Sequence, residues 1–337
     1  MRMAALAMVA ATLWGQATFR TTTQLVVETV SVTDKSGRPN TRLTAKDFVV
    51  TEDGVAQEIK FFEFQRLAEA VAAPPVEGCV EAFARLTRGD IAGGDARYRD
   101  KGLLALYFDL TAMPGPDQVR AFRAAKTFLH RLMTGADLVA VMVFQGGSVR
   151  VLQDFTGDRG RLLRVVETLL VGEDQNAPVD AATAADSGAA FGQNDTEFDM
   201  FFTDRQLSAL QTAAAMLGRL QEKKALVYFA SGLRLNGTNN QAQLQATINA
   251  AVRAGVAFWP IDARGLVASA PMADATQGSP GGAGMYTGAT ANALRGNLQR
   301  SQDTLWTLAA DTGGKALLDS NDLGAGIVRA QQATESY

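Results

Sequence analysis

Short, almost wholly apolar runs alternate with helical patterns along residues 102–330, and this alternation limits the possible fold more than any other feature. The runs are 103–108, 138–144, 225–229 and 256–261. Strands that are buried on both faces have continuous apolar sequences, and the helices between them cover the two faces of a parallel sheet. Gly146-Gly147 turns the chain into 149–152, which we expect to be an antiparallel edge strand. The sequence predicts an α/β fold with a doubly wound, mostly parallel sheet.

The helices expected between these strands have apolar residues at helical spacing. The first of them has Val119, Phe122, Leu129 and Leu132 on one face. The expected helices are 116–133, 159–170, 205–220, 241–254 and 322–332.

A β-rich pattern precedes this region. Residues 25–32 are rich in β-branched side chains, and 48–64 have the pattern of a hairpin that turns at Asp53-Gly54. We therefore expect a small all-β domain over 18–66. Residues 67–100 contain Pro74-Pro75 and scattered charges without periodicity, which is typical of a linker.

The first residues have the pattern of an export signal. Arg2 is followed by an apolar run at 4–14, and Gly15 and Ala17 place small residues where a signal peptidase cleaves. Cleavage after Ala17 would remove 1–17 and send the chain to the periplasm or the extracellular space. The alternative is a buried N-terminal helix, although no amphipathic period is visible before Thr18.

Composition excludes several classes of protein. The formal net charge of the 337 residues is −3, and no cluster of Lys and Arg with interleaved aromatic residues indicates a nucleic-acid surface. No apolar run long enough to span a bilayer follows the signal. Cys79 is the only cysteine, which excludes an intramolecular disulfide. His130 is the only histidine and lies off the apolar face of its helix, so we expect it on the surface rather than as a general base.

The strand at 103–108 ends abruptly at Asp109, and Thr111 follows two residues later. Ligands of doubly wound sheets bind at the carboxyl ends of the strands, where a carboxylate and a hydroxyl suit a hard cation. The alternative is that Asp109 ends the strand and helps to cap the helix behind it. Two long aperiodic segments, 173–203 and 265–301, are either binding loops or solvent-exposed insertions.

Six segments are informative together, namely GLLALYFDLTAM (102–113), DLVAVMVFQGGSVRVLQDFTGDRGRL (137–162), EFDMFFTDRQLSAL (197–210), KKALVYFASGL (223–233), VAFWPIDARGL (256–266) and LAADTGGKAL (308–317). In order and spacing they resemble the von Willebrand factor A (VWFA)-related proteins of acidobacterial type. The segment 32–64 is similar to the β-domain that precedes the A domain in those proteins. The resemblance implies a bacterial, non-enzymatic module that binds protein partners through a metal-ion-dependent adhesion site at the sheet edge.

That adhesion site has a D-x-S-x-S loop, a Thr on a second loop and an Asp on a third. Asp109 and Thr111 match the first loop, but Met113 stands where the second Ser is expected, and a thioether is a poor ligand for a hard cation. Thr203, with Asp204 beside it, matches the second loop. Ala230-Ser231-Gly232 has no carboxylate for the third. The resemblance therefore implies a degenerate metal site that binds Mg²⁺ or Ca²⁺ weakly.

A second arrangement would bring Asp109, Asp204 and Asp262 together around a cation, unless Asp204 caps its helix and Asp262 starts a turn.

The function expected is an exported module that binds a protein partner, and the alternative is a metal-dependent hydrolase that uses the same carboxylates. We expect 101–337 to be the A domain, shortened at its C-terminal end, since the last helix reaches Tyr337 without a further strand.

Overall fold

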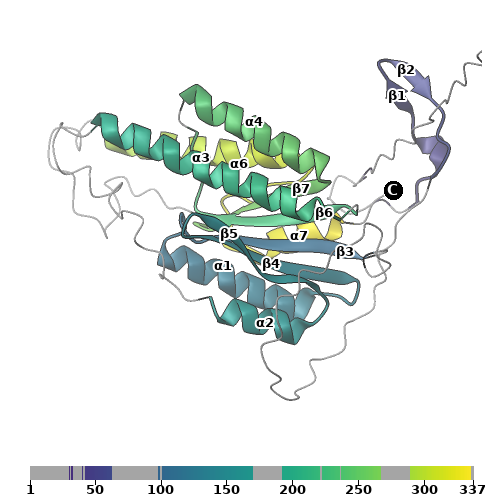
Figure 1. The fold of residues 1–337 in the computed structure, drawn as a ribbon, viewed down its shortest axis with the longest axis horizontal. Helices are drawn as coiled ribbons and strands as arrows, with labels where there is room; N and C mark the ends of the chain where they lie inside the picture. The colour runs from purple at the N-terminus through teal and green to yellow at the C-terminus, as the bar shows by residue number, and fades with distance from the viewer. Residues whose placement is uncertain are drawn as a thin grey trace, which may run out of the picture.

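A five-stranded sheet with the order β5-β4-β3-β6-β7 lies at the centre of the computed structural model (Figure 1). The structure describes residues 30, 32, 40, 42–62, 98, 101–169, 192–220, 222–235, 237–266 and 289–334. Four strands are parallel, and β5 at one edge is antiparallel to β4. The doubly wound α/β architecture expected from the sequence is confirmed. The strands are β3 (Gly102–Asp109), β4 (Asp137–Gln145), β5 (Ser148–Thr156), β6 (Lys224–Ala230) and β7 (Val256–Asp262).

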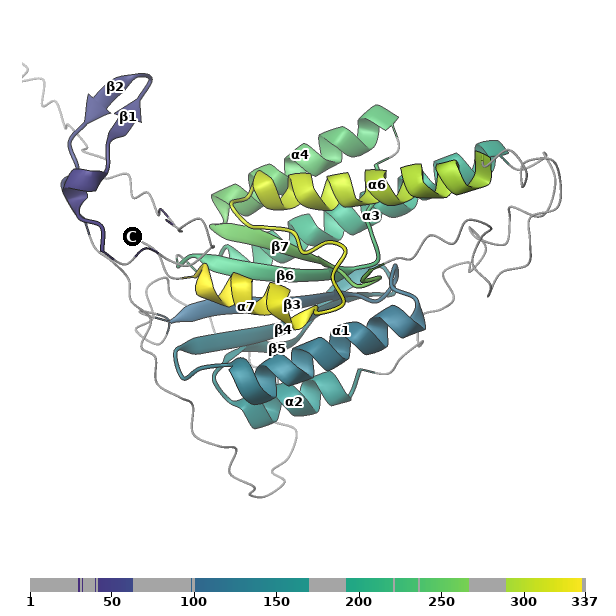
Figure 2. The same cartoon turned by 180° about the vertical axis from the view of Figure 1, so that it is seen from behind.

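Helices cover both faces of this sheet, as Figures 1 and 2 show. On one face lie α1 (Gly115–Thr127), the π-helical turn η2 (Phe128–Leu132), α2 (Arg159–Glu167) and α7 (Gly324–Gln332). On the other face lie α3 (Gly192–Leu217), α4 (Gly237–Arg253) and α6 (Ala289–Ala310).

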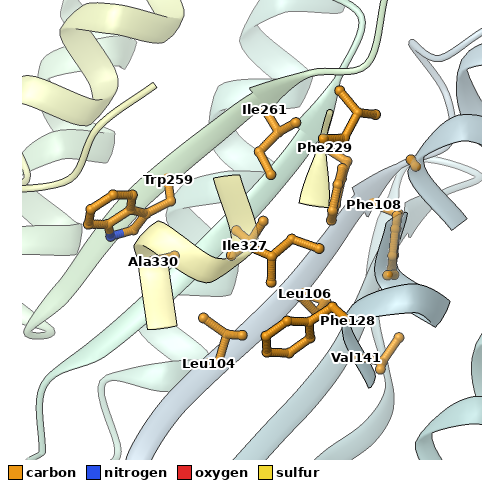
Figure 3. Packing of buried hydrophobic residues seen from close by; sticks show 14 of the residues in the cluster. Leu104, Leu106, Phe108, Phe128, Val141, Phe229, Trp259, Ile261, Ile327 and Ala330 are labelled. Atoms are coloured by element: carbon orange, nitrogen blue, oxygen red, sulfur yellow. The ribbon is translucent and has the colours of Figure 1, made fainter. Parts of the chain in front are cut away.

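Alternate residues of β3 point into the two layers. Leu104, Leu106 and Phe108 pack beneath α1 and α7, where Phe108 stacks on Phe229 of β6 with ring centroids 4.8 Å apart (Figure 3). Ala105 and Tyr107 pack towards α3 and α4. Because successive side chains of a strand point to opposite faces, Asp109 at the end of β3 lies on the α3 side.

The turn predicted at Gly146-Gly147 is present. Gly146 and Gly147 have φ of 58° and 77°, which glycine adopts without steric cost, and they connect β4 to the antiparallel β5. Before α7, Leu317 forms a parallel bridge with Ile261 of β7, so the chain continues the sheet order past β7.

Two helices differ from the sequence prediction. Helix α3 begins at Gly192 rather than at 205, so part of the segment expected as a loop over 173–203 is helical. Helix α6 was not predicted at all, because its sequence is rich in small and polar residues. Its buried side chains, among them Leu305 and Leu308, nevertheless follow helical spacing.

The prediction of the apolar face of the first helix is also partly wrong. Phe122 and Leu129 are buried, but Val119 and Leu132 are 39% and 43% exposed. His130 is exposed, as expected. The cause at Leu132 is the π-helical turn, which adds a residue to the turn and rotates the following side chains out of register.

The described part of the N-terminal β-region is a hairpin. Its elements are η1 (Ala45–Asp47), β1 (Val50–Glu52) and β2 (Val55–Gln57). Asp53 and Gly54 have φ of 49° and 81°, which confirms the predicted turn. Within the expected linker, Tyr98 is buried and packs edge-on against Phe155 of β5.

Residues 1–17, Cys79 and most of the two long aperiodic segments lie outside the described residues. Among the residues that are described, no helix is long and apolar enough to cross a membrane.

Candidate functional site

The carboxyl end of β3 lies where the chain changes direction across the sheet. From β3 the chain adds β4 and β5 on one side, and it then crosses to add β6 and β7 on the other. The connections after β3 and β6 therefore leave the sheet towards opposite faces, which is the position where doubly wound sheets bind their ligands. Asp109 ends β3 at this point.

Asp109 is 1% exposed, and four donors from different parts of the chain surround its carboxyl group. Oδ1 accepts hydrogen bonds from Thr111 Oγ1 at 2.7 Å and from the Ala112 amide at 3.2 Å. Oδ2 accepts from Gln206 Nε2 of α3 at 2.6 Å and from the Tyr228 hydroxyl of β6 at 3.0 Å. Each carboxyl oxygen therefore already has two protein donors.

Burial dominates the electrostatics of this group. Desolvation raises the pKa of Asp109, and the hydrogen bonds from Gln206, Thr111 and Tyr228 oppose that rise. Desolvation and the nearby Asp109 charge also hold the pKa of Tyr107 and Tyr228 well above the ordinary phenol value. The tyrosines therefore stay neutral and present O–H groups.

The other residues of the first loop have distinct roles. Thr111 is half-buried and donates to Asp109, so the predicted pair of carboxylate and hydroxyl is present. Met113 is 3% exposed and belongs to the apolar core on the α1 side. Its thioether fills space between the sheet and the helices.

Neither Thr203 nor Asp204 forms a hydrogen bond with Asp109 among the described residues. Both lie within α3, and Thr203 donates its hydroxyl to the Arg234 carbonyl at 2.8 Å. Asp204 Oδ1 accepts from Asn240 Nδ2 of α4 at 2.5 Å. The residue of α3 that reaches Asp109 is Gln206, one helical turn after Thr203.

The third loop is built from hydrogen bonds to side chains of neighbouring elements. Ser231, which follows β6, donates to Asp117 Oδ2 in the first turn of α1 at 2.5 Å, and Arg120 pairs with Asp117 Oδ1 at 2.5 Å. Asp262, which ends β7, forms a two-pronged ion pair with Arg264, with N–O distances of 2.8 and 2.6 Å. The Ser231–Asp117 contact ties the end of β6 to α1, and Arg264 also donates to Ser301 Oγ of α6 at 3.0 Å.

Asp109, Asp204 and Asp262 thus each have their own protein donors rather than a shared centre. Within the described ranges, no group of three or more His, Cys, Asp or Glu side chains is arranged to hold a metal ion. Sequence reasoning missed Gln206 and Tyr228. The sequence signal that could have found them is a polar side chain within an apolar pattern. Gln206 and Tyr228 both lie among the residues that pack between α3 and the sheet, and buried polar groups need hydrogen-bond partners.

Two large apolar side chains are exposed at this edge of the molecule. Phe201 of α3 is 62% exposed, and the Arg205 guanidinium lies 5.7 Å from the centre of its ring. Leu266, just after β7, is also 62% exposed, and Asn321 Oδ1 accepts a hydrogen bond from its backbone amide. The first half of α3 also extends beyond the ends of the strands (Figure 1).

Comparisons with known proteins give similarity at the level of fold. No family model matches the chain, and no curated protein matches its sequence. An aerotolerance-related membrane protein from Bacteroides fragilis is 14% identical, with a TM-score of 0.41, and the match covers 69% of this chain and 98% of that one. The TFIIH p34 N-terminal domain is 9% identical over 68% and 96% of the two chains, with a TM-score of 0.31. The SpRpn10 VWA domain is 13% identical over 48% and 88%, with a TM-score of 0.23.

Proposed function

We propose that this chain is an exported, non-enzymatic module that binds a protein partner through the carboxyl edge of its sheet, as in von Willebrand factor A-related proteins of acidobacterial type. The observation that carries the proposal is the exposure of Phe201 and Leu266 at that edge. Aromatic residues such as Phe201 are enriched at protein interfaces, and a partner that covers both side chains would remove their apolar area from water.

The state of the carboxylates favours binding over hydrolysis. A metal-dependent hydrolase needs carboxylate oxygens that are free to coordinate a metal or take up a proton. Asp109 is engaged by Gln206 and Tyr228, and Asp262 is engaged by Arg264. Such contacts hold the edge rigid, which lowers the entropic cost of binding.

Mg²⁺ or Ca²⁺ would bind weakly in this proposal, because a cation has to displace the donors on Asp109. We expect partner binding to be independent of the cation. At one hundred times its dissociation constant, a cation that binds only the folded protein raises the free energy of unfolding by about 2.7 kcal/mol. Thermal melts with and without millimolar Mg²⁺, Ca²⁺ or Mn²⁺ measure this directly, and a large shift that Asp109→Ala abolishes would restore a working metal site.

The binding surface is tested by removing its exposed side chains, with an equally exposed side chain on another helix as the control. Phe201→Ala combined with Leu266→Ala should abolish capture of a partner from the envelope fraction of the exporting cell. Trp306→Ala removes a side chain that is 61% exposed on α6, and it should leave capture intact. If capture survives the Phe201 and Leu266 substitutions, or is lost equally with Trp306→Ala, the carboxyl edge is not the binding surface.

Export is tested on its own. N-terminal sequencing of the protein recovered outside the cytoplasm should read from Thr18, because Gly15 and Ala17 meet the cleavage rule. A folded cytoplasmic protein that still begins with Met1 would contradict export and leave the binding surface to be judged separately.

A further inference from the structure

A groove of about 520 Å³ lies between α1-η2 and α7, and its lining residues include Arg131 and Leu132 on one side and Val328 and Arg329 on the other. A volume of this size holds several side chains rather than single waters. Gln331 Nε2 of α7 donates to the Leu132 carbonyl at 3.3 Å and to Asp137 Oδ2 at 2.5 Å. These hydrogen bonds hold the two walls together, so the groove exists before any ligand arrives.

Each wall of the groove contributes one large apolar side chain that is not fully buried, Leu132 from η2 and Val328 from α7. In η2 the Met133 amide donates to the Phe128 carbonyl at 2.9 Å, and this wider turn leaves Leu132 43% exposed while Leu129 is buried. In α7, Ile327 and Ala330 face the sheet (Figure 3), Val328 is half-buried and packs against the same core, and Arg329 is exposed. The groove therefore has an apolar strip between its two walls.

The groove has two unpaired positive charges and one negative charge in its lining. Arg131 and Arg329 are exposed, and neither forms an ion pair or a side-chain hydrogen bond within the part of the chain that the structure describes. Asp322 is the acidic residue of the lining, and its Oδ1 accepts from the Ala325 amide at the start of α7.

The two walls of the groove differ in charge, since residues 319–334 on the α7 side contain Asp319, Asp322 and Arg329, whereas the α1-η2 side is basic. Residues 118–136 contain three Arg, one Lys and His130, and no Asp or Glu, although the whole chain has a net charge of −3. A local cationic surface on an anionic protein attracts and orients an acidic ligand.

We propose that this groove binds an acidic segment of a partner protein, with an apolar side chain between Leu132 and Val328 and carboxylates on Arg131 and Arg329. Arginine favours carboxylates because its planar guanidinium can donate two parallel hydrogen bonds. The apolar strip favours a peptide over a bare polyanion, since phosphates would leave Leu132 and Val328 uncovered. This surface lies on the α1-α7 face, so it is independent of the binding proposed for the carboxyl edge.

The test uses a display library of random 12-residue peptides selected against the whole protein. The enriched peptides should contain two or more Asp or Glu around a Leu, Ile, Val or Phe. A fluorescent copy of one such peptide then gives dissociation constants by anisotropy. Arg131→Glu with Arg329→Glu should weaken its binding by at least about tenfold, because like charges replace both donors.

A matched control changes the net charge by the same amount elsewhere. Arg219 and Arg253 are exposed on the α3-α4 side, and Arg219→Glu with Arg253→Glu should change the dissociation constant by less than about twofold. Leu132→Ser, which keeps both arginines, should also weaken binding. Thermal melts establish that all variants are folded.

Several outcomes would overturn the proposal. These are a failure to enrich acidic peptides, equal loss of binding in the control pair, and unchanged binding by Leu132→Ser. Binding to phosphatidylserine-containing vesicles that depends on Arg131 and Arg329, without any enriched peptide, would assign the groove to a membrane surface instead. None of these outcomes depends on Phe201 or Leu266, so the two proposals can fail separately.

Discussion

Asp109 is a buried carboxyl group whose donors come from its own loop, from α3 and from β6. Removing such a group leaves donors such as Gln206 Nε2 and the Tyr228 hydroxyl without an acceptor in a dry environment, which costs about 1–3 kcal/mol for each buried group left unpaired. The hydrogen-bond donors around Asp109 therefore stabilise the carboxyl edge only while the carboxyl group is there to accept from them.

The stability of the protein should depend on pH through Asp109. Because burial raises its pKa in the folded state, the folded protein holds this proton at pH values where the unfolded chain has released it. The wild type should therefore lose stability relative to Asp109→Asn as the pH rises from about 4 through the raised pKa. Urea unfolding between pH 4 and 7 measures the difference, with Asp303→Asn on α6 as an exposed control. A difference that moves the other way would contradict the assignment.

Lys224 is a second buried ionisable residue, at the opposite edge of the sheet. It is fully buried at the start of β6, and its Nζ donates to the Leu220 carbonyl at 2.5 Å. Desolvation lowers its pKa to about 8, and the nearby Glu222 charge partly opposes this shift. The ammonium form therefore destabilises the folded protein at neutral pH.

Lys224→Met should remove this dependence on pH. Between a folded pKa of about 8 and the higher unfolded value, the unfolded chain binds more protons, so the wild type gains stability as the pH rises. From pH 7.5 to 9.5 it should gain about 2 kcal/mol relative to Lys224→Met. Guanidinium unfolding in this range, below the titration of the tyrosines, measures the gain, and parallel curves for the two proteins would refute it.

At the scale of elements, two glycines in and after α6 have different surroundings, since one has no room for a side chain and the other has open space. Gly314 follows the end of α6, and its amide donates to the Ala309 carbonyl at 2.9 Å. A Cβ atom at Gly314 would lie 1.8 Å from the backbone oxygen of Phe258 in β7. The turn can therefore approach β7 only without a side chain. Gly296, within α6, has no atom within 4 Å of the equivalent position.

The two glycines should respond to alanine in opposite ways. Gly296→Ala should raise the free energy of unfolding by about 0.5–1 kcal/mol, because alanine has the higher helix propensity. Gly314→Ala should lower it by about 2–3 kcal/mol, because the turn has to move away from β7. Denaturant unfolding compares both variants with the wild type. Equal effects would mean that the turn after α6 tolerates a side chain.

At the scale of the whole molecule, the two proposed binding surfaces lie in different places, one at the carboxyl edge of the sheet and one on the helices of the α1-α7 face. The carboxyl edge carries Asp109 and the exposed Phe201, whereas the α1-α7 face carries the basic groove with Arg131 and Arg329. A module with two surfaces can hold two partners at once, or one partner at two points with a gain in avidity.

Hydrogen exchange should show unequal stability across the chain. Strands β3 and β6 are buried along their whole length, so their amides should exchange only through global unfolding. All residues of β1 and β2 are exposed, so the hairpin should exchange through local opening. Exchange measured by mass spectrometry on peptic fragments distinguishes the two regions. Slow exchange in the hairpin would show that it docks on another surface.

The sequence by itself was enough to predict the strands, the antiparallel edge and the two glycine turns, since apolar runs and turn residues act over a few neighbouring positions. It also placed Asp109 and Thr111 at the end of β3. Only the tertiary structure decided what surrounds them. Gln206 and Tyr228 are 97 and 119 residues from Asp109, and no local pattern links them to it. The extra residue in η2 likewise turned Leu132 outwards. These outcomes depend on how packed elements meet, and that is a property of the whole chain.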